Sequence, residues 1–294
     1  MTLTARSRRL RISEWVLVSF FAYICLIAPF FPARPDLGWR PYGVFAAVTA
    51  ALIVIANLEQ GRWSIPITKL RDWLPIVYTL VAFREMELFL PLSYSGQLER
   101  GWVRLDRLVL NQWHLRPAVE HFGPAIPIYL EICYLLVYAL APICVAILYL
   151  LRKRVLADRF WTIFLAGTLL AYGLFPYFPS QPPRFAFPNL DNPDFNTAIR
   201  QLNVSILNKG SIHAGVFPSA HVSSAFACAW AMFVLLPRHK SIGWVLLFYA
   251  VSVSVATIYG RYHYTADVIA GFGVSLVAAA LATLFASKKK GRER

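Results

Sequence analysis

Two histidines and an aspartate lie near the ends of apolar stretches, where their side chains could carry out nucleophilic or acid–base chemistry. His263 and Asp267 are four residues apart, so at the start of a helix they would share one face. A carboxylate in that position accepts a hydrogen bond from one imidazole nitrogen and leaves the other nitrogen free as a base or nucleophile. His221 begins another apolar stretch and could protonate a leaving group. The three residues therefore predict a catalytic site.

Basic residues near these positions indicate an anionic substrate. Arg184 and Arg261 can bind phosphoryl oxygens through their planar guanidinium groups, and Ser219 stands at a predicted helix start, where free backbone N–H groups favour anions. Lys209 and His213 are candidates for a substrate entrance, with plain solvation as the alternative. Ionisable groups close to hydrocarbon are costly and usually serve a function. We therefore predict a phosphate-binding site.

The elements that must position these residues are strongly apolar. Of the 294 residues, 58% are hydrophobic and 15% are charged, whereas a soluble domain carries about 25% charged residues. Apolar stretches long enough to span a bilayer recur along the chain. We predict an all-α, polytopic membrane helical bundle with about eight transmembrane helices. The predicted spans are residues 15–31, 41–58, 73–92, 126–151, 160–178, 217–236, 242–259 and 264–285.

The distribution of charge predicts how the bundle is oriented. Eight spans place both termini on one side, and the segments on that side hold most of the 29 Lys and Arg residues. The positive-inside rule then predicts a multi-pass protein of the cytoplasmic (inner) cell membrane, with cytoplasmic termini and an extracytoplasmic site. The net charge of +14 is spread between apolar stretches, so we predict contact with membrane lipids and not with nucleic acid. Nothing in the sequence indicates an oligomeric state.

Two long loops lie on the predicted extracytoplasmic side, at residues 93–125 and 179–216. The first contains a basic amphipathic stretch, residues 97–119, that could lie in the membrane interface. The second is rich in Pro and Asn and shows no periodic pattern. Within the third predicted span, we expect Arg84 to pair with Glu85, with a lipid headgroup contact as the alternative.

Three short segments resemble the motifs of a known family. Pro218-Ser219-Ala220-His221 and His263-x-x-x-Asp267 look like the second and third motifs of the type 2 phosphatidic acid phosphatase (PAP2) superfamily. Pro182-Pro183-Arg184 stands where the first motif of that family would be. The resemblance covers residues 126–285. It implies a PAP2-like six-helix catalytic core in residues 73–294, with residues 1–72 as extra N-terminal spans.

The resemblance also implies a mechanism that needs neither a metal nor a cofactor. His263 would attack phosphorus and form a phosphohistidine, while Asp267 orients it and balances its charge. His221 would protonate the leaving alcohol and then activate the acceptor. Arg184 and Arg261 would hold the phosphoryl oxygens.

Some positions depart from the usual motifs of the family. Tyr177 stands where lysine is usual, Ala220 where glycine is usual, and Ala256 and Thr257 where Ser-Arg is usual. The looser motifs resemble those of the inositol phosphorylceramide synthase branch, and Asp106 is similar to an acidic element that precedes the core of that branch.

Several functions remain open from the sequence. The leading hypothesis is a membrane lipid phosphatase or phosphotransferase that acts on a phospholipid or a polyprenyl phosphate. A phosphorylceramide-type headgroup transferase is one alternative. Charged residues inside the third predicted span would favour a second alternative, a non-enzymatic lipid transporter. A third is a haem protein with His221 and His263 as axial ligands.

Overall fold

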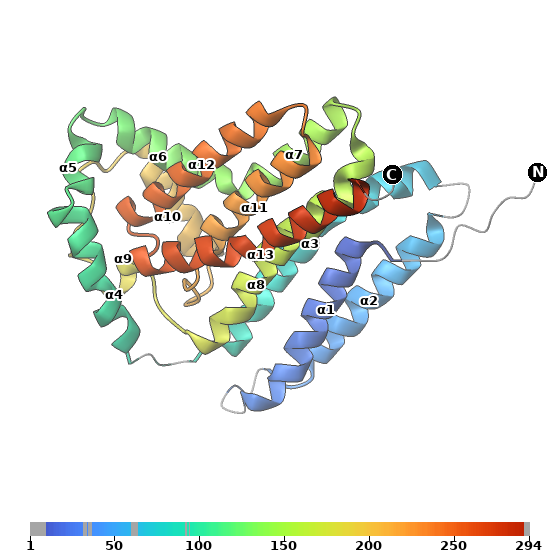
Figure 1. The fold of residues 1–294 in the computed structure, drawn as a ribbon. Helices are drawn as coiled ribbons and strands as arrows, with labels where there is room; N and C mark the ends of the chain where they lie inside the picture. Colours follow the sequence, from blue (N-terminus) through green and yellow to red (C-terminus); the bar gives the residue numbers. More distant parts are fainter. Residues whose placement is uncertain are drawn as a thin grey trace, which may run out of the picture.

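The structure is a computed structural model that describes residues 10–31, 34, 37–59, 64–91, 93 and 95–290. Within these residues all regular secondary structure is helical, which confirms the all-α fold class (Figure 1). Six basic residues used for the predicted orientation lie outside the described residues: Arg6, Arg8, Arg9, Arg62, Arg292 and Arg294.

Each predicted span overlaps one or two of the long helices. They are α1 (Ile12–Ile27), α2 (Arg40–Leu58), α3 (Ser64–Met86), α6 (Ala125–Leu136), α7 (Leu140–Leu150), α8 (Ala157–Leu174), α11 (Ala220–Leu235), α12 (Lys240–Tyr259) and α13 (Thr265–Lys290). The short segment Val137–Ala139 joins α6 to α7, so the two helices fill one predicted span.

In the described part of the chain, five helical segments are long and apolar enough to cross a membrane. They are Ile12–Phe30, Arg40–Leu58, Ala125–Leu150, Arg154–Tyr177 and Lys240–Tyr259. The apolar helices Ala220–Leu235 and Thr265–Leu281 are shorter. A polytopic membrane protein is therefore supported, whereas the count of eight spans and the six-helix core remain predictions.

The helix α3 begins well before the predicted span, at Ser64 instead of residue 73. The predicted span excluded the polar residues Arg71 and Asp72. In the structure both are buried and paired, so the helix runs through them. The predicted boundary between residues 72 and 73 consequently lies inside α3.

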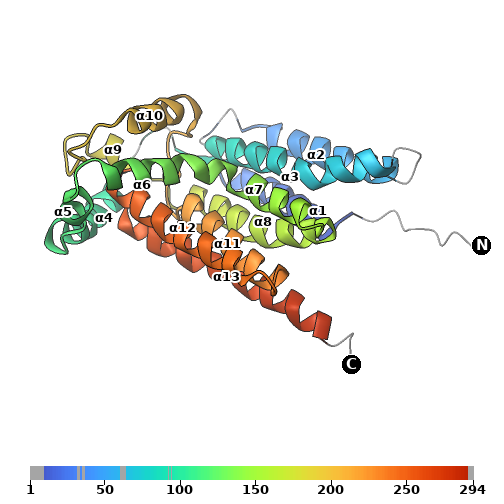
Figure 2. The same cartoon turned by 90° about the horizontal axis from the view of Figure 1, so that it is seen from above.

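A cluster of buried ion pairs joins the N-terminal helices to the rest of the bundle. The guanidinium of Arg11, just before α1, donates to Asp72 of α3 at 2.6 Å. Arg154, which precedes α8, donates to the other oxygen of the same carboxylate at 2.7 Å. Arg71 of α3 pairs with Glu14 of α1. Because α1 also packs along α8, the N-terminal helices form one bundle with the helices that follow (Figures 1 and 2).

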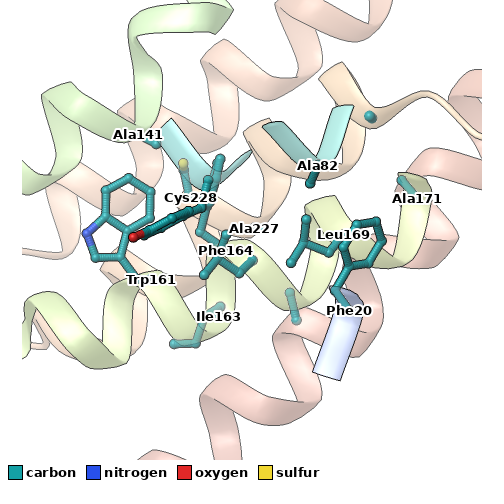
Figure 3. Packing of buried hydrophobic residues seen from close by; sticks show 14 of the residues in the cluster. Phe20, Ala82, Ala141, Trp161, Ile163, Phe164, Leu169, Ala171, Ala227 and Cys228 are labelled. Carbon is teal, nitrogen blue, oxygen red and sulfur yellow. The ribbon is translucent and has the colours of Figure 1, made fainter. Parts of the chain in front are cut away.

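The helix α11 occupies the centre of the bundle and packs against α8, α12 and α13. Its alanines allow close approach, and Gly167 of α8 faces Ala227. Figure 3 shows Trp161 and Phe164 of α8 packed near Ala227 and Cys228 of α11. The start of α11, which carries His221, is therefore held by helices on several sides.

Both long loops contain helices. The first holds α4 (Gln97–Arg107), a π-helical segment (Leu108–Gln112) and α5 (Leu115–Glu120), and the second holds α9 (Pro183–Ala186) and α10 (Ala198–Gly210). These helices gather at one end of the bundle (Figure 2). The face of α4 that packs on the protein is partly acidic, because it buries Glu99 and Asp106 beside Val103.

Candidate active site

A cavity of 450 Å³ reaches the end of the bundle where the loop helices gather, because residues of α9 and α10 contribute to its lining. Residues of α3, α6, α7, α8, α10 and α11 line it, together with the segments around Arg184 and His263. Its ionisable lining consists of Arg84, Arg184, His221 and His263, with tyrosines beside them. Among the described residues, no carboxylate lines the cavity, and no group of three or more His, Cys, Asp or Glu could hold a metal ion.

The two predicted catalytic histidines face each other in this cavity. Nδ1 of His221, in the first turn of α11, lies 3.2 Å from Nε2 of His263, in the turn between α12 and α13. The backbone N–H of Ser219 donates to the carbonyl oxygen of Asp267 at 2.9 Å. This bond fixes the start of α11 against the first turn of α13, and so it sets the distance between the two imidazoles.

Hydrogen bonds determine which nitrogen of His263 carries the proton. Its Nδ1 lies 3.0 Å from the carbonyl oxygen of Val216 and 3.3 Å from Oδ2 of Asp267. Both are acceptors, so we assign the proton to Nδ1 and leave Nε2 with its lone pair. Burial lowers the pKa of His263 well below its usual value, and the proximity of His221 and Arg184 lowers it further. A neutral imidazole with a free Nε2 can act as a nucleophile.

The same reasoning extends to His221. Because Nε2 of His263 is an acceptor, Nδ1 of His221 must donate to it. Nε2 of His221 then accepts from the hydroxyl of Tyr138 at 3.1 Å. Tyr138, between α6 and α7, was not predicted, because a tyrosine in an apolar span gives no signal that separates it from an interfacial residue. The ring of Tyr134 stacks on His221, with 5.2 Å between centroids.

The carboxylate of Asp267 is completely buried. Its Oδ2 accepts the backbone N–H of Tyr264 at 2.8 Å as well as facing His263. Among the described residues, Oδ1 has no hydrogen-bond partner. The residue is therefore positioned to orient His263 and to stabilise positive charge that develops on its ring.

Arg184 brings a positive charge to the cavity. Its guanidinium lies 4.6 Å from the ring centre of Phe185 and 5.8 Å from that of Tyr262. No carboxylate of the described residues pairs with it, and its Nε has no hydrogen-bond partner. Burial lowers the pKa of Arg184, but a guanidinium stays charged at neutral pH. An unpaired cation beside two neutral imidazoles is suited to bind a phosphate.

Arg261, a predicted phosphate-binding residue, does not line the cavity. Its side chain is completely buried. Nη1 donates to Oδ2 of Asp106 at 2.6 Å, and Oδ1 of Asp106 accepts the backbone N–H of Thr265 at 2.7 Å. The pair therefore holds the turn that carries His263. The partner lies 155 residues away in the chain, so local motif reading could not identify it.

The other predicted binding residues also lie outside the cavity. Ser219 is completely buried, and its hydroxyl accepts the backbone N–H of Val222 at 3.4 Å as the N-cap of α11. Lys209 is exposed on α10. Nδ1 of His213 lies 2.5 Å from Oε1 of Glu87, on the outside of a loop whose inner residues line the cavity.

A buried acid that the sequence reading missed supports the same site. Glu131 of α6 accepts hydrogen bonds from Arg200 at 3.0 Å, from Asn203 at 2.7 Å and from the hydroxyl of Tyr262 at 2.6 Å. The ring of Tyr262 in turn stacks on Tyr134, with 3.9 Å between centroids. This network connects α6 and α10 to the residue that precedes His263.

Comparison with known proteins gives two matches and one negative result. The family model described as the PAP2 superfamily matches residues 102–281, more than half of the chain. A PA-phosphatase related-family protein of Dictyostelium discoideum is 37% identical over 68 residues, which are 23% of this chain and 11% of that relative. The chain thus matches only a small part of that relative's length. No solved structure matches.

Proposed function

The chain belongs to the PAP2 superfamily, and from this premise we propose that it is a membrane lipid phosphatase or phosphotransferase that works through a phosphohistidine on His263. The observation that carries the proposal is the pair of imidazoles, 3.2 Å apart, beside the unpaired guanidinium of Arg184 in one cavity. The nucleophile, the proton donor and the anion-binding group of a phosphoryl transfer are then present together.

The shape and lining of the cavity favour a lipid substrate. Away from the histidines it is lined by apolar side chains, including Leu80 of α3, Pro142 of α7 and Trp161 of α8. On α8 the lining extends from Tyr172 to Trp161, about 16 Å along the helix axis. A phosphate bound at Arg184 would leave this apolar part for a hydrocarbon chain.

The first half-reaction begins with the opening of the imidazole pair. Nε2 of His263 cannot both accept the hydrogen bond of His221 and attack phosphorus, so the phosphate must displace that contact. Nε2 then forms a bond to phosphorus, and the bond from phosphorus to the lipid oxygen breaks. The negative charge of the bound phosphate favours protonation of His221 at both ring nitrogens. The resulting imidazolium donates one proton to the lipid oxygen and becomes neutral, while Asp267 stabilises the positive charge on the His263 ring.

The second half-reaction determines the class of enzyme. His221, now a base, removes a proton from the acceptor, whose oxygen attacks phosphorus as the bond to His263 breaks. Water as acceptor gives hydrolysis, whereas a lipid alcohol or a polyol gives headgroup transfer. The looser motifs favour a transferase of the phosphorylceramide type as the second candidate.

The orientation in the membrane belongs to the same proposal. With cytoplasmic termini, the cluster around Asp72 lies at the cytoplasmic end and the cavity opens toward the extracytoplasmic face. Protease cleavage of terminal tags in sealed vesicles tests this orientation. Tags cleaved only from the extracytoplasmic side would contradict it.

The activity is tested by release of inorganic phosphate from a panel of lipid phosphates, with EDTA present. We expect release by the wild type and by a His239→Ala control, whose histidine is exposed outside the cavity, and none by His263→Ala. A lack of release in all three samples calls for the same panel with lipid and polyol acceptors. Turnover by His263→Ala at the wild-type rate would refute the mechanism.

A further inference from the structure

One wall of the cavity comes from a helix outside the family match. The match covers residues 102–281, whereas α3 ends at Met86. One face of α3 lines the cavity, with Ile76, Thr79, Leu80, Phe83 and Arg84 at helical spacing. The ring of Phe83 lies 5.5 Å from that of Tyr172 on α8. A lipid in the cavity would therefore contact α3 as well as the matched region.

The guanidinium of Arg84 has no counterion in the described part of the chain. The sequence suggested a pair with Glu85, but that buried carboxylate accepts from Nη2 of Arg40 at 3.0 Å. Successive residues on a helix point in different directions, so Glu85 faces α2 while Arg84 faces the cavity. The cavity thus contains two arginines, Arg84 and Arg184, and no lining carboxylate among the described residues.

The two arginines come from different walls of the cavity, α3 and α9. Arg184, on α9, is the arginine whose charge lowers the pKa of His263. Arg84 is on α3, at the upper end of a wall that extends down to Ile76, about 12 Å along the helix axis. One phosphate held at His263 would neutralise Arg184 and leave the exposed guanidinium of Arg84 available for a second anionic group.

We propose that Arg84 is a specificity-determining residue that binds a second, unreactive anionic group of the lipid substrate. Arg184 and His263 hold the reacting phosphate, and the apolar face of α3 contacts the hydrocarbon chain of the lipid. The inference rests on the proposed function, because it assumes that a lipid phosphate occupies the cavity.

The test compares the binding of farnesyl monophosphate and farnesyl diphosphate. These two probes share one hydrocarbon chain and differ in the number of phosphate groups. Binding is measured in the His263→Ala background, so that it does not depend on turnover. We expect Arg84→Gln to weaken diphosphate binding about tenfold or more, as loss of a charged hydrogen bond does, and to change monophosphate binding far less. Arg84→Lys should restore part of the loss. The control Arg104→Gln removes an equal charge from the exposed side of α4 and should change the binding of neither probe.

Each other result has a definite meaning. Equal loss for both probes would show that Arg84 holds the reacting phosphate and would overturn the inference. No loss for either would show that Arg84 contacts only bilayer headgroups and would overturn it too. Binding of neither probe, even without the Arg84 change, would refute both this inference and the proposed function. Suppose that Arg84→Gln weakens only diphosphate binding, and that the wild type turns over no substrate. The proposed role of Arg84 would then be supported, and only the proposed reaction would be refuted.

Discussion

Asp106 holds Arg261 and the first backbone N–H of α13 with its two carboxylate oxygens, at 2.6 and 2.7 Å. The side chains of Asp106 and Arg261 are completely buried. His263 lies between the two residues that this carboxylate binds, Arg261 and Thr265. The position of the proposed nucleophile therefore depends on a carboxylate that does not line the cavity.

Replacement of Asp106 by Asn should destabilise the protein. The change leaves Arg261 buried without its counterion, and breaking a buried pair in this way costs about 3–5 kcal/mol. The measurement is the free energy of unfolding in detergent, with activity alongside. The double variant Asp106→Asn/Arg261→Gln should lose less than the sum of the two single variants. If Arg261 bound phosphate instead, Arg261→Gln would raise KM and leave the unfolding free energy unchanged.

Replacement of Tyr138 by Phe should slow the reaction without unfolding the protein. The hydroxyl fixes the tautomer of His221, and a hydrogen bond of this kind contributes about 0.5–1.5 kcal/mol, or roughly two- to tenfold in kcat. The pH profile of kcat should also shift, because without this hydroxyl nothing fixes which ring nitrogen of His221 carries the proton. Tyr129→Phe is the matched control, since that hydroxyl bonds Ser252 away from the cavity. An unchanged profile in Tyr138→Phe would remove Tyr138 from the mechanism.

The pH dependence should reflect the lowered pKa of His263. A lowered pKa keeps the imidazole neutral, and therefore nucleophilic, below the usual value of about 6.5. The acid limb of kcat/KM should then lie below that pH. Arg184→Gln removes a positive charge that lowers the pKa, so the limb should move to higher pH, whatever the loss of rate.

Ionisation of the substrate affects the pH profile of the variant and of the wild type equally, so a difference between the two profiles on one substrate reports on the enzyme. Arg104→Gln provides the charge-matched control and should leave the limb in place. A limb that does not move in Arg184→Gln would mean that this guanidinium does not act on His263.

Replacement of Asp267 by Asn should impair formation of the phosphoenzyme. An amide at this position can still accept a hydrogen bond from the ring through its oxygen, but it is neutral and cannot balance positive charge that develops on the His263 ring. We expect a loss in kcat of about a hundredfold or more, in the range of acid–base and charge effects at active sites. Labelled phosphate trapped on the protein by rapid quenching provides the measurement. Wild-type amounts of acid-labile phosphoenzyme in Asp267→Asn would refute the role.

The sequence predicted those parts of the structure that depend on local patterns. The helix ranges follow from apolar stretches, and the closeness of His263 to Asp267 follows from a four-residue spacing. The opposition of His221 and His263 follows from two histidines at the ends of apolar stretches on the same predicted side of the membrane. The catalytic roles of these residues remain predictions.

What the sequence could not predict depends on partners far apart in the chain. The start of α3 was missed because the ion pairs that bury Arg71 and Asp72 involve α1 and the segment before α8. The sequence suggested Arg84, the adjacent residue, as the partner of Glu85. The actual partner, Arg40, lies on another helix and could not be identified from local spacing. The helix α10 was missed because its buried Asn203 is satisfied by Glu131 of α6.

The division of the cavity between α3 and the family-matched region has an evolutionary consequence. Residues proposed to break and form bonds come from the matched region, while Phe83, Arg84 and the apolar face below them come from a helix outside it. If the proposed function holds, substitutions in α3 would change which lipid is accepted while the reacting groups stay untouched. Related chains are free to diverge in substrate along this wall under separate selection from the reaction they catalyse.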